Sequence, residues 1–271
     1  MRKKKKKNLP NISYLLDTSI QIEKCKYTKE VSSFLEKKRN SGYYFVSSFF
    51  VLYEFKTGLL KSIIDFYFDI KAYGDIAEAL VRWSDKFGIR QVKNILTTQA
   101  VIYRINESIE TKDINEYLKK LQTIIFHLEA NFSTHLSSIV GEFQNNELIK
   151  LSIRNEDEYK IFLDAYNRRK IIPLGSFWKK HNKELNNLLL DTAFQSEKKL
   201  EKMYRYLKDI KTDVKKSDKF HHNKGVGDAV ITVDCAKKRI IMTLDNSFSL
   251  LCPPLNKKFE ILDKDNLRNC L

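Results

Sequence analysis

The stretch that decides the fold is ISYLLDTS, residues 12–19, in which a short apolar run ends in Asp17 and two hydroxyl residues. A run of this kind predicts a buried strand that ends in a turn at the acid. A helix is expected at residues 28–38, a second strand at residues 43–46, and a further helix with one apolar side from about Ser48. This alternation of strands and helices predicts a parallel sheet flanked by helices.

The end of the chain repeats the alternation, with a helix expected at residues 228–237, a strand at 239–244, a short helix at 247–252 and a last strand at 259–262. Between about residues 63 and 223 the strand signals fade and apolar residues recur at helical spacing. The sequence therefore predicts an α/β unit in two pieces and a mostly helical insertion. The expected boundaries are residues 12–62 plus 225–271 for the α/β unit, 63–224 for the insertion and 1–11 for a basic flexible tail.

The charge of the chain points to a polyanionic partner. Its 271 residues include 49 basic and 34 acidic side chains, which gives a formal charge of +15. Nucleic acid and an anionic membrane surface both attract such a surplus, and a general bias toward lysine codons would also produce it. No apolar stretch is long enough to span a bilayer, and the basic start is not followed by the apolar core of a secretory signal. We therefore expect a nucleic-acid partner and no membrane.

The cysteines indicate a reducing compartment. The four of them lie far apart and form no CxxC pair: Cys25, Cys235, Cys252 and Cys270. This spacing gives neither a zinc signature nor a disulfide framework. A cytoplasmic location is expected.

Four acidic residues share an unusual placement. Asp17 and Asp245 each follow an expected strand, Glu54 lies in the helix after the second strand, and Asp228 opens a helix. The carboxyl ends of parallel strands and the starts of the following helices gather at one edge of a sheet, so all four can converge. Clustered carboxylates repel one another unless a cation lies among them, and hard oxygen ligands without His or Cys select Mg²⁺ or Mn²⁺. Such ions activate water and bind phosphate oxygens, as phosphodiester cleavage requires.

Each acid also has a simpler explanation. Asp17 suits a turn at the end of a strand, Asp228 complements a helix N-terminus, and Asp245 suits a turn or a helix cap. Glu54 is the hardest to explain in this way, because it lies in the strongly apolar stretch FFVLYEF, residues 49–55, where a lone carboxylate is disfavoured. Their common placement at one sheet edge favours a metal site.

Four short motifs resemble those of the PIN-domain family of nucleases. The stretch YLLDTS at residues 14–19 resembles the first motif, and SSFFVLYEF at 47–55 resembles the second. The stretch GDAVI at 227–231 is similar to the third motif, and TLDNSF at 243–248 is similar to the fourth. The order of the motifs and the 17-residue separation of the last two acids also agree. The resemblance covers residues 12–62 and 225–262.

This resemblance implies a three-layer α/β/α sandwich with a central parallel sheet and a metal-dependent endoribonuclease activity that needs Mg²⁺ or Mn²⁺. It implies that Asp17, Glu54 and Asp228 are the core metal ligands, and that Asp245 completes the catalytic site directly or through water. Thr18 and Thr243 become nearby hydroxyls that assist substrate binding, although ordinary turn hydroxyls would look the same.

The chain departs from many members, VapC-type toxins among them, in the 173 residues that separate Glu54 from Asp228. The insertion could bind substrate or dock a partner, so a toxin or defence effector held by an inhibitory or regulatory protein is one interpretation, and an oligomer is another possibility. A DNA nuclease of related fold and a non-catalytic scaffold that binds nucleic acid remain alternatives. The lysines nearest the third motif in sequence are our candidates for phosphate contacts: Lys215, Lys216, Lys219 and Lys224.

Overall fold

A computed structural model describes residues 12–87, 100, 102, 113–169 and 171–268. The expected basic tail at residues 1–11 and Cys270 therefore lie outside the described residues. Five strands form one sheet in the order β3-β2-β1-β4-β5, and every neighbouring pair is parallel. The strands are β1 (Ile12–Leu16), β2 (Tyr43–Ser48), β3 (Leu136–Val140), β4 (Arg239–Thr243) and β5 (Lys258–Ile261).

Successive residues of the central strands point to opposite faces of the sheet, and both faces are buried. On one face, Leu15 of β1 packs in the same core as Val46 of β2 and Ile241 of β4. On the other face, the neighbouring residues Leu16 and Met242 pack in a second, smaller core. A parallel sheet with crossover helices has no solvent-facing side, so its strands are apolar at consecutive positions.

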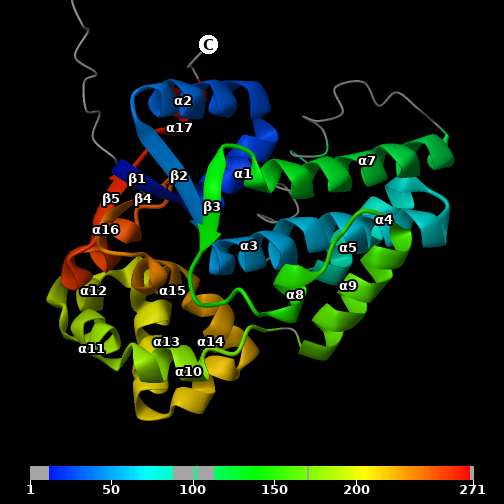
Figure 1. Ribbon diagram of the computed structural model, residues 1–271. Coiled ribbons are helices and arrows are strands. Elements are labelled where there is room, and N and C mark those ends of the chain that lie inside the picture. The colour runs from blue at the N-terminus through cyan, green and yellow to red at the C-terminus, as the bar shows by residue number, and fades with distance from the viewer. Residues whose placement is uncertain (1–11, 88–99, 101, 103–112, 170, 269–271) are drawn as a thin grey trace, which may run out of the picture.

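Helices cover both faces of the sheet, which makes three layers (Figure 1). The smaller core is closed by α2 (Thr28–Asn40) and α17 (Lys264–Arg268), which pack together on one face. The larger core lies on the other face and contains apolar side chains of α3 (Phe49–Phe55), α15 (Gly227–Asp234) and α16 (Phe248–Leu251). The predicted α/β class with a parallel sheet in an α/β/α sandwich is confirmed.

Helix α1 (Thr18–Lys26), directly after β1, was not expected from the sequence. The reason is that it buries polar side chains, among them Gln21 and Lys24, so no apolar stripe marks it. The Lys24 ammonium donates hydrogen bonds of 3.0 Å to the carbonyls of Phe132 and Thr134, where α7 ends. A cation at a helix C-terminus satisfies free carbonyls and complements the helix dipole, which makes the burial of this lysine tolerable.

The helix that carries Glu54 continues into a π-helical segment. Ser48, where the sequence predicts this helix to begin, caps α3 by accepting a hydrogen bond of 3.1 Å from the amide of Val51. The π-helical segment η1 (Lys56–Leu60) begins two residues after Glu54 and leads into α4 (Lys61–Tyr73). Such wide turns inside helices are frequent at functional sites.

The insertion is mostly helical, as expected, but it also supplies the edge strand β3, which pairs with β2 and was not predicted. Its apolar side chains join the larger core of the sheet rather than a core of their own. No helix among the described residues is long and apolar enough to cross a membrane. In chain order, the described helices of the insertion after α4 are α5 (Ile76–Phe87), α7 (Ile114–Ser133), α8 (Glu147–Lys150), α9 (Glu156–Arg169), α10 (Gly175–Lys180), α11 (Asn182–Leu190), α12 (Thr192–Ser196), η3 (Lys198–Leu200), α13 (Glu201–Thr212), η4 (Val214–Asp218) and α14 (Phe220–Gly225).

The last part of the chain follows the predicted order with small shifts at the element ends. Helix α15 ends three residues earlier than expected, at Asp234, and β4 and β5 lie within one residue of their predicted positions. The short helix α16 is followed by the 3-10 turn η5 (Pro253–Leu255). Differences of this size are usual at element ends, where local signals are weakest.

Candidate active site

The strand order places a crevice between β1 and β4. The chain leaves β1 toward β2 on one side of the sheet and later returns to β4 on the other side. The connections that follow β1 and β4 therefore diverge at the carboxyl ends of these two neighbouring strands. In open parallel sheets, ligands bind at this switch point. Asp17 directly follows β1, and Asp245 lies two residues after the end of β4.

Asp17 is the most deeply buried of the four acids, with 3% of its surface exposed. Its Oδ2 accepts hydrogen bonds of 2.9 Å from the hydroxyls of Ser19 and Thr243, and one of 3.3 Å from the Ser19 amide. The last contact makes Asp17 the N-cap of α1, so the structural role that the sequence left open is real as well. Burial raises the pKa of Asp17, and the donated hydrogen bonds lower it in part.

Glu54 reaches the site from α3. Its Oε2 accepts a hydrogen bond of 2.6 Å from the Thr18 hydroxyl. Burial raises the pKa of Glu54 to about 7, the nearby Asp17 adds to this rise, and Thr18 and Lys224 oppose it. Gly227, the first residue of α15, lies against Glu54, and a Cβ at this position would overlap the Oε1 atom. The glycine of the third motif thus leaves room beside α15 for the Glu54 carboxylate in its present position.

The electrostatic surroundings of Asp228 show that the four acids lie close together. Burial is the largest cause that raises its pKa well above the ordinary value, and repulsion by Asp17, Glu54 and Asp245 adds to it. Ser247 connects two of the acids, because its hydroxyl donates to Asp228 Oδ2 at 3.0 Å and its amide donates to Asp245 Oδ1 at 2.8 Å. Asp245 itself is exposed.

The donor set fits a hard divalent cation such as Mg²⁺ or Mn²⁺. All four groups are carboxylates, neither His nor Cys is among them, and an ion would relieve the repulsion that raises the pKa of Asp228. In the described part of the chain, however, no three His, Cys, Asp or Glu side chains are already arranged to hold an ion. Three of the four carboxylates instead accept a hydrogen bond from a hydroxyl.

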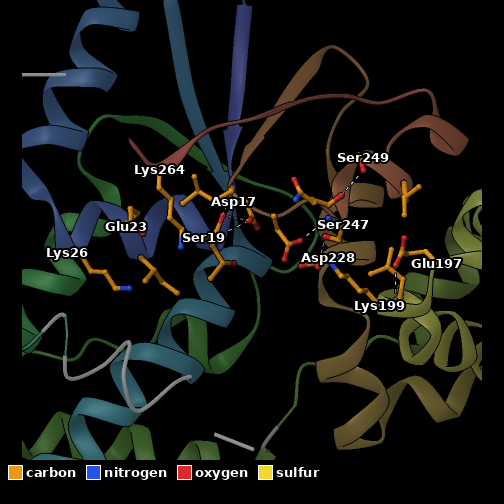
Figure 2. A pocket seen from close by; sticks show the side chains of 17 residues that line it. Asp17, Ser19, Glu23, Lys26, Glu197, Lys199, Asp228, Ser247, Ser249 and Lys264 are labelled. Atoms are coloured by element: carbon orange, nitrogen blue, oxygen red, sulfur yellow. Dashed lines mark hydrogen bonds between the residues drawn. The ribbon is translucent and has the colours of Figure 1, made fainter. Parts of the chain in front are cut away.

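The acids face a cleft of about 670 Å³. Asp17, Asp228 and Asp245 line it, and Figure 2 shows Asp17 and Asp228 at its centre. Glu54 is not part of its wall but is hydrogen-bonded to Thr18, which is. Seventeen residues surround this space, and they come from the start and the end of the chain and from the insertion: Asp17, Thr18, Ser19, Ile22, Glu23, Lys26, Glu197, Lys199, Leu200, Asp228, Leu244, Asp245, Asn246, Ser247, Ser249, Leu250 and Lys264.

Two serines that the sequence reasoning missed are part of the site. The Ser19 hydroxyl contacts Asp17 at 2.9 Å, lies 3.3 Å from the hydroxyl of Thr243 and accepts a hydrogen bond of 3.0 Å from the amide of Leu244. Ser247 makes the two contacts described above. A signal existed in the sequence, because both serines stand two residues after an acid, in the repeated pattern Asp-x-Ser. That pattern gives an amide-to-carboxylate turn at the end of β1 and again after β4.

The structure places the candidate substrate-binding residues in two groups. Thr18 and Thr243 contact the acids directly, through Glu54 and Asp17 respectively. The four predicted lysines do not line the cleft. Lys215 and Lys219 are exposed elsewhere, and Lys216 forms an ion pair of 3.5 Å with Asp209.

Lys224 lies near Glu54 and outside the cleft wall. Its ammonium is 5.9 Å from the centre of the Tyr53 ring and 3.4 Å from the Thr57 hydroxyl. The side chain keeps an exposed part, but the protein around the ammonium lowers the pKa of Lys224, and attraction by Glu54 opposes this change. Lys224 is therefore an electrostatic neighbour of an acid rather than a residue of the cleft wall.

No protein-family model, no curated protein and no solved structure matches this chain. What the site does must therefore be inferred from its own residues.

Proposed function

We propose that the protein is a metal-dependent endoribonuclease, which hydrolyses internal phosphodiester bonds of RNA with Mg²⁺ or Mn²⁺ held by Asp17, Glu54, Asp228 and Asp245. The observation that carries the proposal is the convergence of these four acids at the switch point of a parallel sheet, where three of them line one cleft. Four carboxylates that lie close together repel one another, which lowers the stability of the fold. A bound cation would offset this repulsion.

The residues of the site have distinct tasks in this reaction. When bound, the cation neutralises charge on the phosphate and makes an attacking water more acidic. Asp17 and Asp228 would hold it from the floor of the cleft, and Asp245 from its exposed edge. The hydroxyls of Ser19 and Thr243 orient Asp17, as Thr18 orients Glu54 and Ser247 orients Asp228. Such outer partners fix the direction of each ligand oxygen.

RNA is the substrate that the whole chain supports best. The formal charge of +15 suits a polyanion, and lysines line the cleft together with the acids. The four motifs, in their order, resemble those of the PIN-domain nucleases, which supports RNA over DNA. The three described cysteines are free thiols, in keeping with the cytoplasm as the compartment. A toxin or defence role would add an inhibitory partner.

The test compares the wild type with Asp17→Asn and with the matched control Asp234→Asn. Asp234 lies on the same helix as Asp228, but it faces the amide of Glu142 instead of the cleft. Single-stranded RNA and DNA of one sequence are incubated with each protein in Mg²⁺, in Mn²⁺ and in EDTA. We expect metal-dependent cleavage of RNA that Asp17→Asn loses by more than about a hundredfold, beyond the ten- to hundredfold cost of losing an outer partner of a ligand.

Two results would contradict parts of this proposal. Cleavage that persists in EDTA, or that is equal in the wild type and Asp17→Asn, would show that the acids are not the catalytic site. Cleavage of DNA alone would leave the site correct and make the substrate wrong. Circular RNA tests the internal position of the cut, because it offers no end to an enzyme that removes terminal nucleotides.

A further inference from the structure

Lysines from three separate elements line the cleft beside the acids. Lys26 is the last residue of α1, Lys199 lies in η3, and Lys264 is the first residue of α17. Lys199 and Lys264 are exposed, and neither ammonium forms an ion pair or hydrogen bond with any residue that the structure describes. Both therefore remain available to an anion that enters the cleft.

These lysines stand on opposite sides of the acids. Figure 2 shows Lys26 and Lys264 on the α1 side of Asp17, and Lys199 on the far side beyond Asp228, extending from the η3 wall toward the acids. A polyanion at the acids meets strong repulsion, so its neighbouring charges need compensation close by. The two exposed lysines supply that compensation on each side.

Four aliphatic side chains also line the cleft, Ile22, Leu200, Leu244 and Leu250, and no aromatic ring does so among the described residues. Glu23, Glu197, Asn246, Ser247 and Ser249 complete its wall. Bases that pack on the aliphatic side chains meet no hydrogen-bonding code there. Contacts to phosphates then determine the position of the strand and not its sequence.

We propose that Lys199 and Lys264 bind the phosphates on opposite sides of the phosphodiester that is cleaved. The nucleic-acid strand then runs across the acids from α17 to the η3 wall. This assignment rests on the proposed nuclease function and gives it a direction and a binding surface. It also explains why an internal bond is cut, because the strand must extend to both sides of the acids to reach both lysines.

The lysines that are closest to the third motif in sequence provide matched controls. Lys215 and Lys219 are exposed and carry the same charge, but they lie outside the cleft. If attraction by the net charge were diffuse, removing any of these four lysines would have the same effect. If the cleft lysines bind phosphates directly, only Lys199 and Lys264 matter.

The first measurement is the salt dependence of binding to a fluorescent single-stranded RNA, in a parent protein that carries Asp17→Asn to prevent cleavage. We expect Lys199→Gln and Lys264→Gln each to lower the slope of log K against log salt by about 0.7. If the variant and the parent bind equally at 1 M salt, this change corresponds to about fivefold weaker binding by the variant than by the parent at 0.1 M salt. Lys215→Gln and Lys219→Gln should leave the slope unchanged. Equal losses in all four variants would overturn the assignment.

The second measurement tests the two sides separately with RNAs that carry one uncharged methylphosphonate linkage on either side of the cut. Lys199→Gln should have no further effect when one linkage is neutral, and Lys264→Gln should have none when the other is neutral. Such non-additivity is the mark of a direct contact. If both variants responded to the same linkage, or to neither, the strand path would be wrong.

Failure of this inference is distinguishable from failure of the proposed function. If the wild type cleaves RNA while the lysine variants bind it as tightly as the parent, the function stands and the strand path is wrong. If the wild type cleaves no nucleic acid in Mg²⁺ or Mn²⁺, the nuclease proposal is wrong, whichever lysines bind the RNA.

Discussion

The ends of strands β1 and β4 carry the same local motif in two different environments. Asp17-Thr18-Ser19 and Asp245-Asn246-Ser247 both form a turn in which the serine amide donates to the acid, at 3.3 Å and 2.8 Å. Asp17 is nevertheless buried and receives two further hydroxyl donors, whereas Asp245 is exposed. The same motif thus identifies two candidate metal ligands, and we expect the site to depend more on the buried one, Asp17, than on Asp245.

The largest expected effect separates these two acids. Asp17→Asn should lower the cleavage rate by more than about a hundredfold. Asp245→Asn should lower it by about tenfold, the lower end of the losses found for residues at the edge of a metal site. Adding Mn²⁺ should raise the Tm of Asp245→Asn and leave that of Asp17→Asn unchanged, because a ligand stabilises only the fold that binds it. Activity assays and thermal unfolding measure both. Equal losses in the two variants would remove the distinction between a buried and a peripheral ligand.

Gly227→Ala tests whether cleavage depends on the position of the Glu54 carboxylate beside α15. The new Cβ would displace the Glu54 carboxylate, so we expect a loss of cleavage of about ten- to hundredfold with little change in fold. Gly58→Ala is the matched control, since a Cβ there meets nothing within 4 Å. Kinetics and circular dichroism measure the two effects. Wild-type activity in Gly227→Ala would show that the position of Glu54 is unimportant.

Ser19 and Ser247, the serines of the repeated Asp-x-Ser pattern, should differ as Asp17 and Asp245 do, with the larger effect at Ser19. Ser19→Ala leaves Asp17 with one hydroxyl donor fewer and the Leu244 amide without its partner, so we expect about tenfold lower activity and a stability loss of about 1–2 kcal/mol. Ser247→Ala removes one hydroxyl contact to Asp228 and should cost less stability. Urea unfolding and kinetics of both variants measure this. A larger stability loss in Ser247→Ala would reverse the ranking.

The smallest expected effect concerns an aspartate outside the cleft. Burial raises the pKa of Asp234 to about 6, an effect that the Glu142 amide only partly opposes. The pKa of Asp234 is higher in the folded protein than in the unfolded chain. The free energy of unfolding therefore falls as the pH rises from about 4 to above 6, and this loss is absent below that range. A folded pKa of about 6 sets an upper bound of about 3 kcal/mol, which the partial exposure of Asp234 reduces. Asp234→Asn should therefore be more stable than the wild type by about 1 kcal/mol at pH 7.5, and the difference should shrink toward zero at pH 4 and below. Urea unfolding at the two pH values decides it, and equal stability at both would contradict the pKa.

Much of the fold could be predicted, because strand-ending motifs and apolar runs are local signals. β1 was predicted at its full length, and the parallel arrangement followed from the alternation of strands and helices. Helix α1 was missed because it buries two polar side chains, Gln21 and Lys24. Lys24 has its hydrogen-bond partner far along the chain, at Phe132, and the Gln21 side chain has none among the described residues. β3 was missed because LSSIV is a short, partly exposed edge strand within a helical stretch and has no distinctive pattern.

The basic residues show the limit most clearly. Proximity in sequence to the third motif suggested Lys215 and Lys219, which lie away from the cleft. Lys199 and Lys264 line it instead, although they are separated from Asp17 by most of the chain. Other lysines are occupied inside the molecule, as Lys56 is by the carbonyls of Ile149 and Leu151. Net charge alone could not distinguish these roles.

The sequence by itself determined the parallel α/β sheet and the placement of the four acids at the ends of strands and the starts of helices. An apolar strand and the turn that follows it consist of consecutive residues, so their pattern can be read directly. Only the tertiary structure decided which acid is buried, which hydroxyl orients it and which lysines share its cleft. Those properties depend on contacts such as that of Thr243 with Asp17, which joins residues 226 positions apart. No local pattern encodes such a contact, since it exists only once the strands have assembled and the helices have closed over them.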